Sequence, residues 1–144
     1  MIYKADYAMH PNGVFDCHLH IKKGLDGYPL PLLGGNVIFN TIDEYQKEAP
    51  NYPGFYHTLI FDFTKPTCFY DELVHNKRIV ALKIHSRLQK IGSNNYEGII
   101  SAIGEISSNI PIIYDAFYYG GDLDHQPNLS GLIKMIKAFP NRKF

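Results

Sequence analysis

The chain has 144 residues, with 14 basic and 14 acidic side chains, a formal net charge of zero and 14% aromatic residues. An apolar fraction of 45% with 19% charge indicates a folded globular protein, because a disordered chain lacks the apolar surface that offsets its entropy. The balanced charge disfavours nucleic-acid binding, and every apolar stretch is far shorter than the roughly 20 residues that span a bilayer.

Five short runs of apolar, β-branched or aromatic residues predict strands, because each is bounded by Gly, Pro or Asn. They run from Val14 to Ile21, Asn36 to Asn40, Tyr56 to Phe63, Arg78 to His85 and Ile110 to Phe117.

Helical signals lie between these runs. Thr41 and Glu44 match a capping box, in which a hydroxyl and a carboxylate satisfy backbone N–H groups at a helix start. Two further segments carry apolar stripes at three- and four-residue steps, which predict amphipathic helices that pack on the sheet. The stripes consist of Tyr96, Ile99, Ile100, Ile103 and Ile106, and of Leu129, Leu132, Ile133, Ile136 and Phe139.

The alternation of strands and helices predicts an α/β fold with mostly parallel strands, since parallel neighbours cannot be joined by a tight turn. We find no repeat, low-complexity tract or linker, so residues 1–144 are expected to form a single domain. Cys17 and Cys68 lie far apart without CxxC spacing, which favours a reducing cytoplasm over an oxidising compartment.

The first predicted strand carries the most informative pattern. Because alternate strand residues share a face, Phe15 and Cys17 should point to the helix-covered side, with His18 and His20 on the other side. Two imidazoles at this spacing can converge on one divalent ion. An HxH triplet also arises by chance in a chain with 7 histidines, so the motif alone is weak.

The fourth predicted strand alternates in the same way. Leu82 and Ile84 should face the helices, while Lys83 and His85 point away from them. An ordinary solvated strand face would look identical, and only the presence of His18 and His20 favours a site.

Two carboxylates lie within other predicted strands. Asp115 follows a very apolar run, where burial of an unpaired carboxylate would be costly, so it needs a cation, a donor or water. Asp62 sits similarly, although a helix or turn cap explains it at least as well.

These residues carry a family resemblance. Asp16-Cys17-His18-Leu19-His20 resembles the DxHxH opening of the amidohydrolase superfamily of metal-dependent hydrolases. Ala81-Leu82-Lys83-Ile84-His85-Ser86 resembles the G-[IV]-K-[LI]-H-P strand of its amidohydrolase-2 branch. Ile110-Pro111-Ile112-Ile113-Tyr114-Asp115 resembles the P-[VI]-x-x-H strand that follows. The order and spacing of all three motifs agree with the family.

The resemblance implies a TIM-barrel-like (β/α) fold with a divalent metal at the carboxyl ends of its strands. His18 and His20 would be the first two ligands, and Asp115, which replaces the family's histidine, would be a third. Lys83 and His85 would line the pocket of a small polar substrate, whose C–N, C–O or C–C bond is attacked by metal-activated water. Zinc is the first choice of metal, and manganese, iron or nickel are alternatives.

The resemblance covers about five strands, whereas a complete barrel needs about 250 residues and rarely fewer than 200. We therefore expect an incomplete barrel whose open edges lead to a homo-oligomer or to association with the missing barrel half. Catalysis by the isolated chain is expected to be impaired, because the family's eighth-strand aspartate is absent.

Two other functions are compatible with the same residues. The polar face could bind a ligand or partner without a reactive metal, in a non-catalytic α/β module. A phosphoesterase that opens with HxH is the second alternative, and it would recruit further ligands from His10, His57 and His75.

Overall fold

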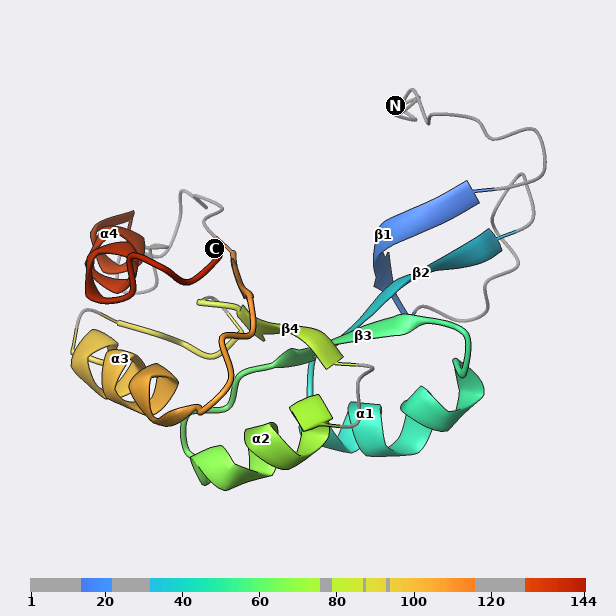
Figure 1. Cartoon of the computed structure of the whole chain (residues 1–144), viewed down its shortest axis with the longest axis horizontal. Helices are drawn as coiled ribbons and strands as arrows, with labels where there is room; N and C mark the ends of the chain where they lie inside the picture. Colours follow the sequence, from blue (N-terminus) through green and yellow to red (C-terminus); the bar gives the residue numbers. More distant parts are fainter. Residues whose placement is uncertain (1–13, 22–31, 76–78, 87, 93, 116–128) are drawn as a thin grey trace.

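The structure is a computed structural model that describes residues 14–21, 32–75, 79–86, 88–92, 94–115 and 129–144. Its five strands form one sheet in sequence order, and every neighbouring pair is parallel. The strands are β1 (Val14–His20), β2 (Leu32–Phe39), β3 (Tyr56–Ile60), β4 (Ile79–Ile84) and β5 (Ile112–Tyr114). The sheet curls into a half-barrel, so the predicted α/β fold with an incomplete barrel of five parallel strands is confirmed (Figure 1).

Four α-helices flank the sheet. They are α1 (Ile42–Glu48), α2 (Thr67–His75), α3 (Tyr96–Glu105) and α4 (Leu129–Ala138), and a 3-10 turn, Ala49–Asn51, follows α1. Figure 1 shows α1 and α2 side by side against one face of the sheet, with α3 and α4 stacked beyond β4. Within the described residues, no helix is long and apolar enough to cross a membrane.

The start of α1 follows from its capping residues. The Thr41 hydroxyl accepts a hydrogen bond from the backbone N–H of Glu44 at 3.0 Å, as the sequence predicts. The Glu44 carboxylate accepts from the backbone N–H of Asn40 at 2.6 Å, one residue earlier than in the standard capping box. Both contacts fix the direction in which the chain leaves β2.

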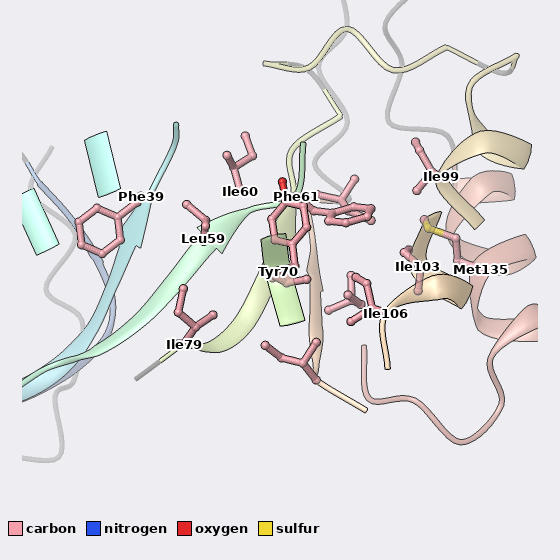
Figure 2. Packing of buried hydrophobic residues seen from close by; sticks show 14 of the residues in the cluster. Phe39, Leu59, Ile60, Phe61, Tyr70, Ile79, Ile99, Ile103, Ile106 and Met135 are labelled. Atoms are coloured by element: carbon pink, nitrogen blue, oxygen red, sulfur yellow. The ribbon is translucent and has the colours of Figure 1, made fainter. Parts of the chain in front are cut away.

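The hydrophobic core lies between the helices and one face of the sheet. Leu59, Leu82 and Ile84 are fully buried there, so the predicted orientation of β4 is confirmed. Figure 2 shows Ile99 and Ile103 of α3 close to Met135 of α4, with Tyr70 of α2 beside Phe61. Burial of these apolar side chains supplies the main driving force for the fold.

The opposite face of the sheet carries polar side chains. Asn36 of β2 donates to the Thr58 hydroxyl of β3 at 2.9 Å and to the Cys17 backbone carbonyl of β1 at 3.3 Å. One amide thereby connects three neighbouring strands on the face that would line the interior of a barrel.

The predicted orientation of Phe15 and Cys17 is wrong. Phe15 is 59% exposed and Cys17 is also exposed, whereas Leu19 is buried with the core. The pairing of β1 with β2 shifts between Asp16 and Leu19. The three residue steps from Asp16 to Leu19 on β1 lie opposite the two steps from Gly35 to Val37 on β2. This irregularity breaks the alternation on which the prediction rested, because a bulge rotates the residues before it relative to those after it.

The predicted apolar stripe of α4 is only partly buried, although Phe139 packs against the core. Ile133 and Ile136 are 43% and 44% exposed, and α4 instead packs on α3 through Gly131 and Met135. A Cβ atom on Gly131 would lie 2.0 Å from the Tyr96 ring, so only glycine permits this approach. The close contact sets which side of α4 is buried and overrides the apolar stripe.

The segment after α4 lies along the outer edge of β5. The Lys143 backbone carbonyl accepts a hydrogen bond from the Ile112 N–H at 2.9 Å. The Arg142 guanidinium donates to the Ile110 carbonyl at 3.1 Å and lies 5.6 Å from the centre of the Phe139 ring. These contacts place the segment beside β5, where a sixth strand of a barrel would lie.

Candidate functional site

The two histidines of β1 converge. The Nε2 atoms of His18 and His20 lie 3.1 Å apart, and their rings meet edge to face. The Asp16 carboxylate accepts a hydrogen bond from the His18 backbone N–H at 2.8 Å within the irregular part of β1. The irregular pairing that turns Phe15 away from the core lies in the same part of β1 as the two imidazoles.

This separation fits shared coordination of a metal. Two nitrogen ligands at about 2.0–2.1 Å from a tetrahedral ion are about 3.3 Å apart, close to the observed 3.1 Å. Two neutral imidazoles can donate a lone pair each to one ion, and the side chains of His18 and His20 thus form a fitting pair of ligands.

The environment of His18 favours its neutral form. Partial burial lowers the pKa of His18 below 6.5, and the positive charge of Lys83 lowers it further, whereas the carboxylates of Asp16 and Asp115 oppose the shift. A neutral imidazole is the form that binds metal, so His18 does not have to lose a proton near neutral pH. The same interactions show that His18, Lys83 and Asp115 influence one another across the sheet.

Lys83 lies on the polar face of β4, two strands from β2. Its register neighbours are Ile60 on β3 and Ile113 on β5, and only 5% of the residue is exposed. Burial lowers the pKa of Lys83 below 10.5, and the Asp115 carboxylate partly offsets this shift. Burial therefore makes the Lys83 amine easier to deprotonate than an exposed lysine.

His85 and Asp115 form the contact that joins the ends of β4 and β5. The His85 Nδ1 atom lies 3.0 Å from the Asp115 carboxylate, and the Asp115 backbone N–H donates to the Ile84 carbonyl at 3.0 Å. The Leu88 backbone N–H also donates to His85 Nδ1 at 3.4 Å, so this nitrogen has two contacts that orient the ring. The pair therefore has the composition of an oriented acid–base group.

Gln89 holds this end of β4 in place. Its side-chain carbonyl accepts from the His85 backbone N–H at 2.8 Å, and its amide donates to the Phe61 carbonyl at 2.6 Å. Gln89 thus bridges the segments that follow β3 and β4 and fixes the position of His85.

A pocket of about 600 Å³ opens beside these strand ends. Its walls include Asn40, which follows β2, Ile60 and Asp62 at the end of β3, and Gln89. The Asn40 amide lies 3.4 Å from His20 Nδ1, so the pocket adjoins the histidine pair through this residue. The volume lies within the range that accommodates a small organic molecule.

The structure places the predicted site residues at one end of the sheet but does not gather them into one complete cluster. Among the described residues, no group of three or more His, Cys, Asp or Glu side chains is arranged to hold a metal. Asp115 contacts His85, and it acts on His18 through its charge. The proposed three-ligand set of His18, His20 and Asp115 therefore stays a prediction.

Other residues named from the sequence have structural roles. The Asp62 carboxylate accepts from the Thr64 backbone N–H at 3.0 Å, as expected for a turn cap. His57 is buried on the helix-covered face against the rings of Phe39 and Tyr45. His75 ends α2 and lies 2.6 Å from the Asp71 carbonyl, and His10 lies outside the described residues.

Sequence reasoning missed Asn40 and Gln89. Asn40 is the last residue of a predicted strand, and its place at a carboxyl end could have marked it as a site residue. Gln89 follows the fourth strand by several residues, and nothing in its local pattern marks it.

Comparisons of this chain with protein-family models, with curated proteins and with solved structures find no match.

Proposed function

We propose that the chain is a metal-dependent hydrolase domain of the amidohydrolase type, in which His18 and His20 hold a divalent ion. The observation that carries the proposal is the 3.1 Å separation of their Nε2 atoms at the carboxyl end of β1. In open α/β sheets and barrels of parallel strands, ligands bind at this end. Asp115, at the corresponding end of β5, is the proposed third ligand.

A divalent ion bound there would polarise the substrate and lower the pKa of water. The residues of the chain have separate tasks. Asn40, 3.4 Å from His20 Nδ1, orients that ring, as hydrogen-bonding partners of metal ligands do. His85, oriented by Asp115 at 3.0 Å, moves a proton at its Nε2 atom. The 600 Å³ pocket beside Asn40 receives the body of a small polar substrate.

The donor set favours zinc, because two imidazoles and one carboxylate are common zinc ligands, and manganese, iron and nickel accept the same atoms. Substrate identity depends on side chains that shape the pocket rather than on the metal.

A titration with Co²⁺ tests the metal site and its third ligand together. Tetrahedral or five-coordinate Co²⁺ absorbs in the visible range, and the band intensity reports coordination number. We expect one equivalent to bind the native chain, and Asp115→Asn to bind more weakly with an altered spectrum. Asp71→Asn is the matched control, since Asp71 accepts from the Ser107 backbone N–H away from the histidine pair.

No visible band with native protein would contradict the proposed site. It would favour the alternative of a non-catalytic ligand-binding module that uses the 600 Å³ pocket. An unchanged spectrum in Asp115→Asn would remove Asp115 from the ligand set while leaving the histidine pair in place.

A further inference from the structure

The outer edge of β1 is an open edge of the sheet. β1 is the first strand in the sheet order, and among the described residues only β2 pairs with it. At the other end of the sheet, the Lys143 carbonyl accepts a hydrogen bond from the Ile112 N–H of β5. Figure 1 shows β1 at the end of the sheet away from α3 and α4. Its outer edge therefore offers backbone N–H and C=O groups to a further strand.

The histidine pair lies on this edge strand. His18 is exposed, and its Nε2 atom lies 3.1 Å from the Nε2 atom of His20. Leu19, which lies between them, is buried with the core, so the two imidazoles share the opposite face of the strand. A tetrahedral zinc ion takes four ligands, and the pair supplies two of them.

A second copy of the chain can supply the other two ligands. Within one chain, Asp115 is the proposed third ligand, but its carboxylate already lies 3.0 Å from His85 Nδ1. In the part of the chain that the structure describes, no three His, Cys, Asp or Glu side chains are gathered around one ion position. The histidine pair of a second copy has the same 3.1 Å spacing, and its use leaves the contact between His85 and Asp115 in place.

Antiparallel pairing of two β1 strands would bring the histidine pairs together. With Leu19 of each copy at the two-fold axis, His18 of one copy lies opposite His20 of the other, and all four imidazoles share one face. Directly opposed residues of antiparallel strands have Cβ atoms about 4.5–5.5 Å apart, which lets their imidazoles reach one ion. The formal net charge of zero adds no overall repulsion between the copies.

The irregular pairing in β1 makes this association depend on metal. The register of β1 with β2 shifts between Asp16 and Leu19, and such irregularities twist an edge strand and limit its pairing with another chain. β1 also ends at His20, so few backbone hydrogen bonds can form around Leu19. The bonds to a shared ion therefore have to supply most of the affinity.

We propose that one divalent ion joins two copies of this chain when metal is scarce, with His18 and His20 of each copy as its four ligands. The inference rests on the proposed function in taking these two histidines as metal ligands. Four imidazoles leave no position for water on a tetrahedral ion, so the shared site is closed to the proposed hydrolysis. Excess metal separates the copies, because each histidine pair then holds an ion of its own.

Sedimentation velocity with Zn²⁺ tests the proposal on the native chain. The protein is stripped with EDTA, dialysed and titrated from no metal to two ions per chain, while a competing zinc indicator records binding. We expect a monomer without metal, a dimer that is most abundant at one ion per two chains, and a return to monomer above one ion per chain.

The failure of this proposal is distinguishable from the failure of the metal site. A chain that binds Zn²⁺ but stays monomeric at every ratio would overturn the shared ion and leave the proposed site of the single chain intact. A chain that binds no Zn²⁺ would overturn both. A dimer that is present without metal and does not respond to it would overturn the shared ion.

Three variants identify the ligands. A folded His18→Ala/His20→Ala variant should stay monomeric at every ratio, whereas His75→Ala, which removes an exposed imidazole at the end of α2, should dimerise like the native chain. Asp115→Asn should form the same dimer but keep it in excess Zn²⁺, because only the site of the single chain uses Asp115. A zinc-dependent dimer of the double variant, or loss of the dimer in folded Asp115→Asn, would overturn the assignment.

Discussion

The contact between β1 and β2 at Gly35 should be among the least tolerant positions of the sheet. Gly35 pairs with Asp16, and a Cβ atom added there would lie 2.3 Å from the Asp16 carbonyl oxygen. Real Cβ contacts essentially never fall below 3.0 Å, so the strands would have to separate by roughly 0.7 Å. Both atoms of the Asp16 carbonyl group belong to the backbone, and no side-chain rotation relieves the contact.

Gly35→Ala should therefore lower the free energy of unfolding by about 1–3 kcal/mol, the usual cost of overpacking. At roughly 2–4 °C per kcal/mol for a chain of this size, the melting temperature should fall by about 2–12 °C. Displacement of β1 should also weaken binding of Zn²⁺ by His18 and His20. Circular dichroism melts and an isothermal titration with Zn²⁺ measure the two effects.

Gly98→Ala is the matched control. Gly98 lies inside α3, and a Cβ atom there meets nothing within 4 Å. Alanine should stabilise this exposed helical position by about 0.5–1 kcal/mol, because glycine loses more backbone entropy on folding. If Gly35→Ala melted at or above the temperature of the native protein, the close approach of the two strands at this position would be refuted.

Four further substitutions test the packing of the sheet and of α2. Leu82→Asp should lower the free energy of unfolding by about 4 kcal/mol or more, because Leu82 is fully buried, while Lys83→Ala should lower it much less. Equal melting temperatures of the two variants would refute the assigned faces of β4. The pKa of Lys83 is lower in the folded than in the unfolded state, so native stability rises with pH between the lowered value and about 10.4. Lys83→Met should thus raise the free energy of unfolding by about 1 kcal/mol at pH 7, as measured by urea unfolding, and this increase should shrink towards pH 10. An increase that does not change with pH would show that burial of the Lys83 charge is not its cause. Tyr70→Phe should lower the free energy of unfolding by about 1–3 kcal/mol, because the Tyr70 hydroxyl accepts from the Asp62 N–H at 2.7 Å and donates to the Asp62 carbonyl at 3.0 Å. An unchanged midpoint of urea unfolding would show that water replaces the hydroxyl.

Local signals in the sequence predicted much of the fold. The Thr41 cap set the start of α1, and the alternation of Leu82, Lys83 and Ile84 gave the orientation of β4. Such patterns succeed because the residues that determine them are neighbours in the chain. The helix α2 carried no such pattern, since Tyr70 is its only fully buried residue.

The failures have long-range causes. The orientation of Phe15 depends on the shifted pairing of β1 with β2, which no β1 residue specifies alone. The buried side of α4 depends on Gly131, where the Tyr96 ring approaches from α3. A glycine can thus determine which side of a helix is buried even where the apolar stripe predicts another side. The residue that contacts Gly131, Tyr96, lies 35 positions earlier in the sequence.

Part of the candidate site was predictable because the residues that form it are neighbours in the chain. His18 and His20 are close in sequence, and the strand pattern brought them to one end of the sheet. The contact between His85 and Asp115 crosses from β4 to β5 and needs the parallel register of those strands. The role of Asn40 depends on the bulge in β1 as well as on the end of β2.

The most direct test of the account is the metal content of the freshly purified chain by elemental analysis. The comparison is between the native protein, the double variant His18→Ala/His20→Ala and the control His75→Ala, which removes an exposed imidazole at the end of α2. We predict about one equivalent of divalent metal in the native protein and in the control, and none above background in a folded double variant. Equal metal content in all three, or no metal in the native protein after loading with zinc or manganese, would contradict the assignment of His18 and His20 as metal ligands.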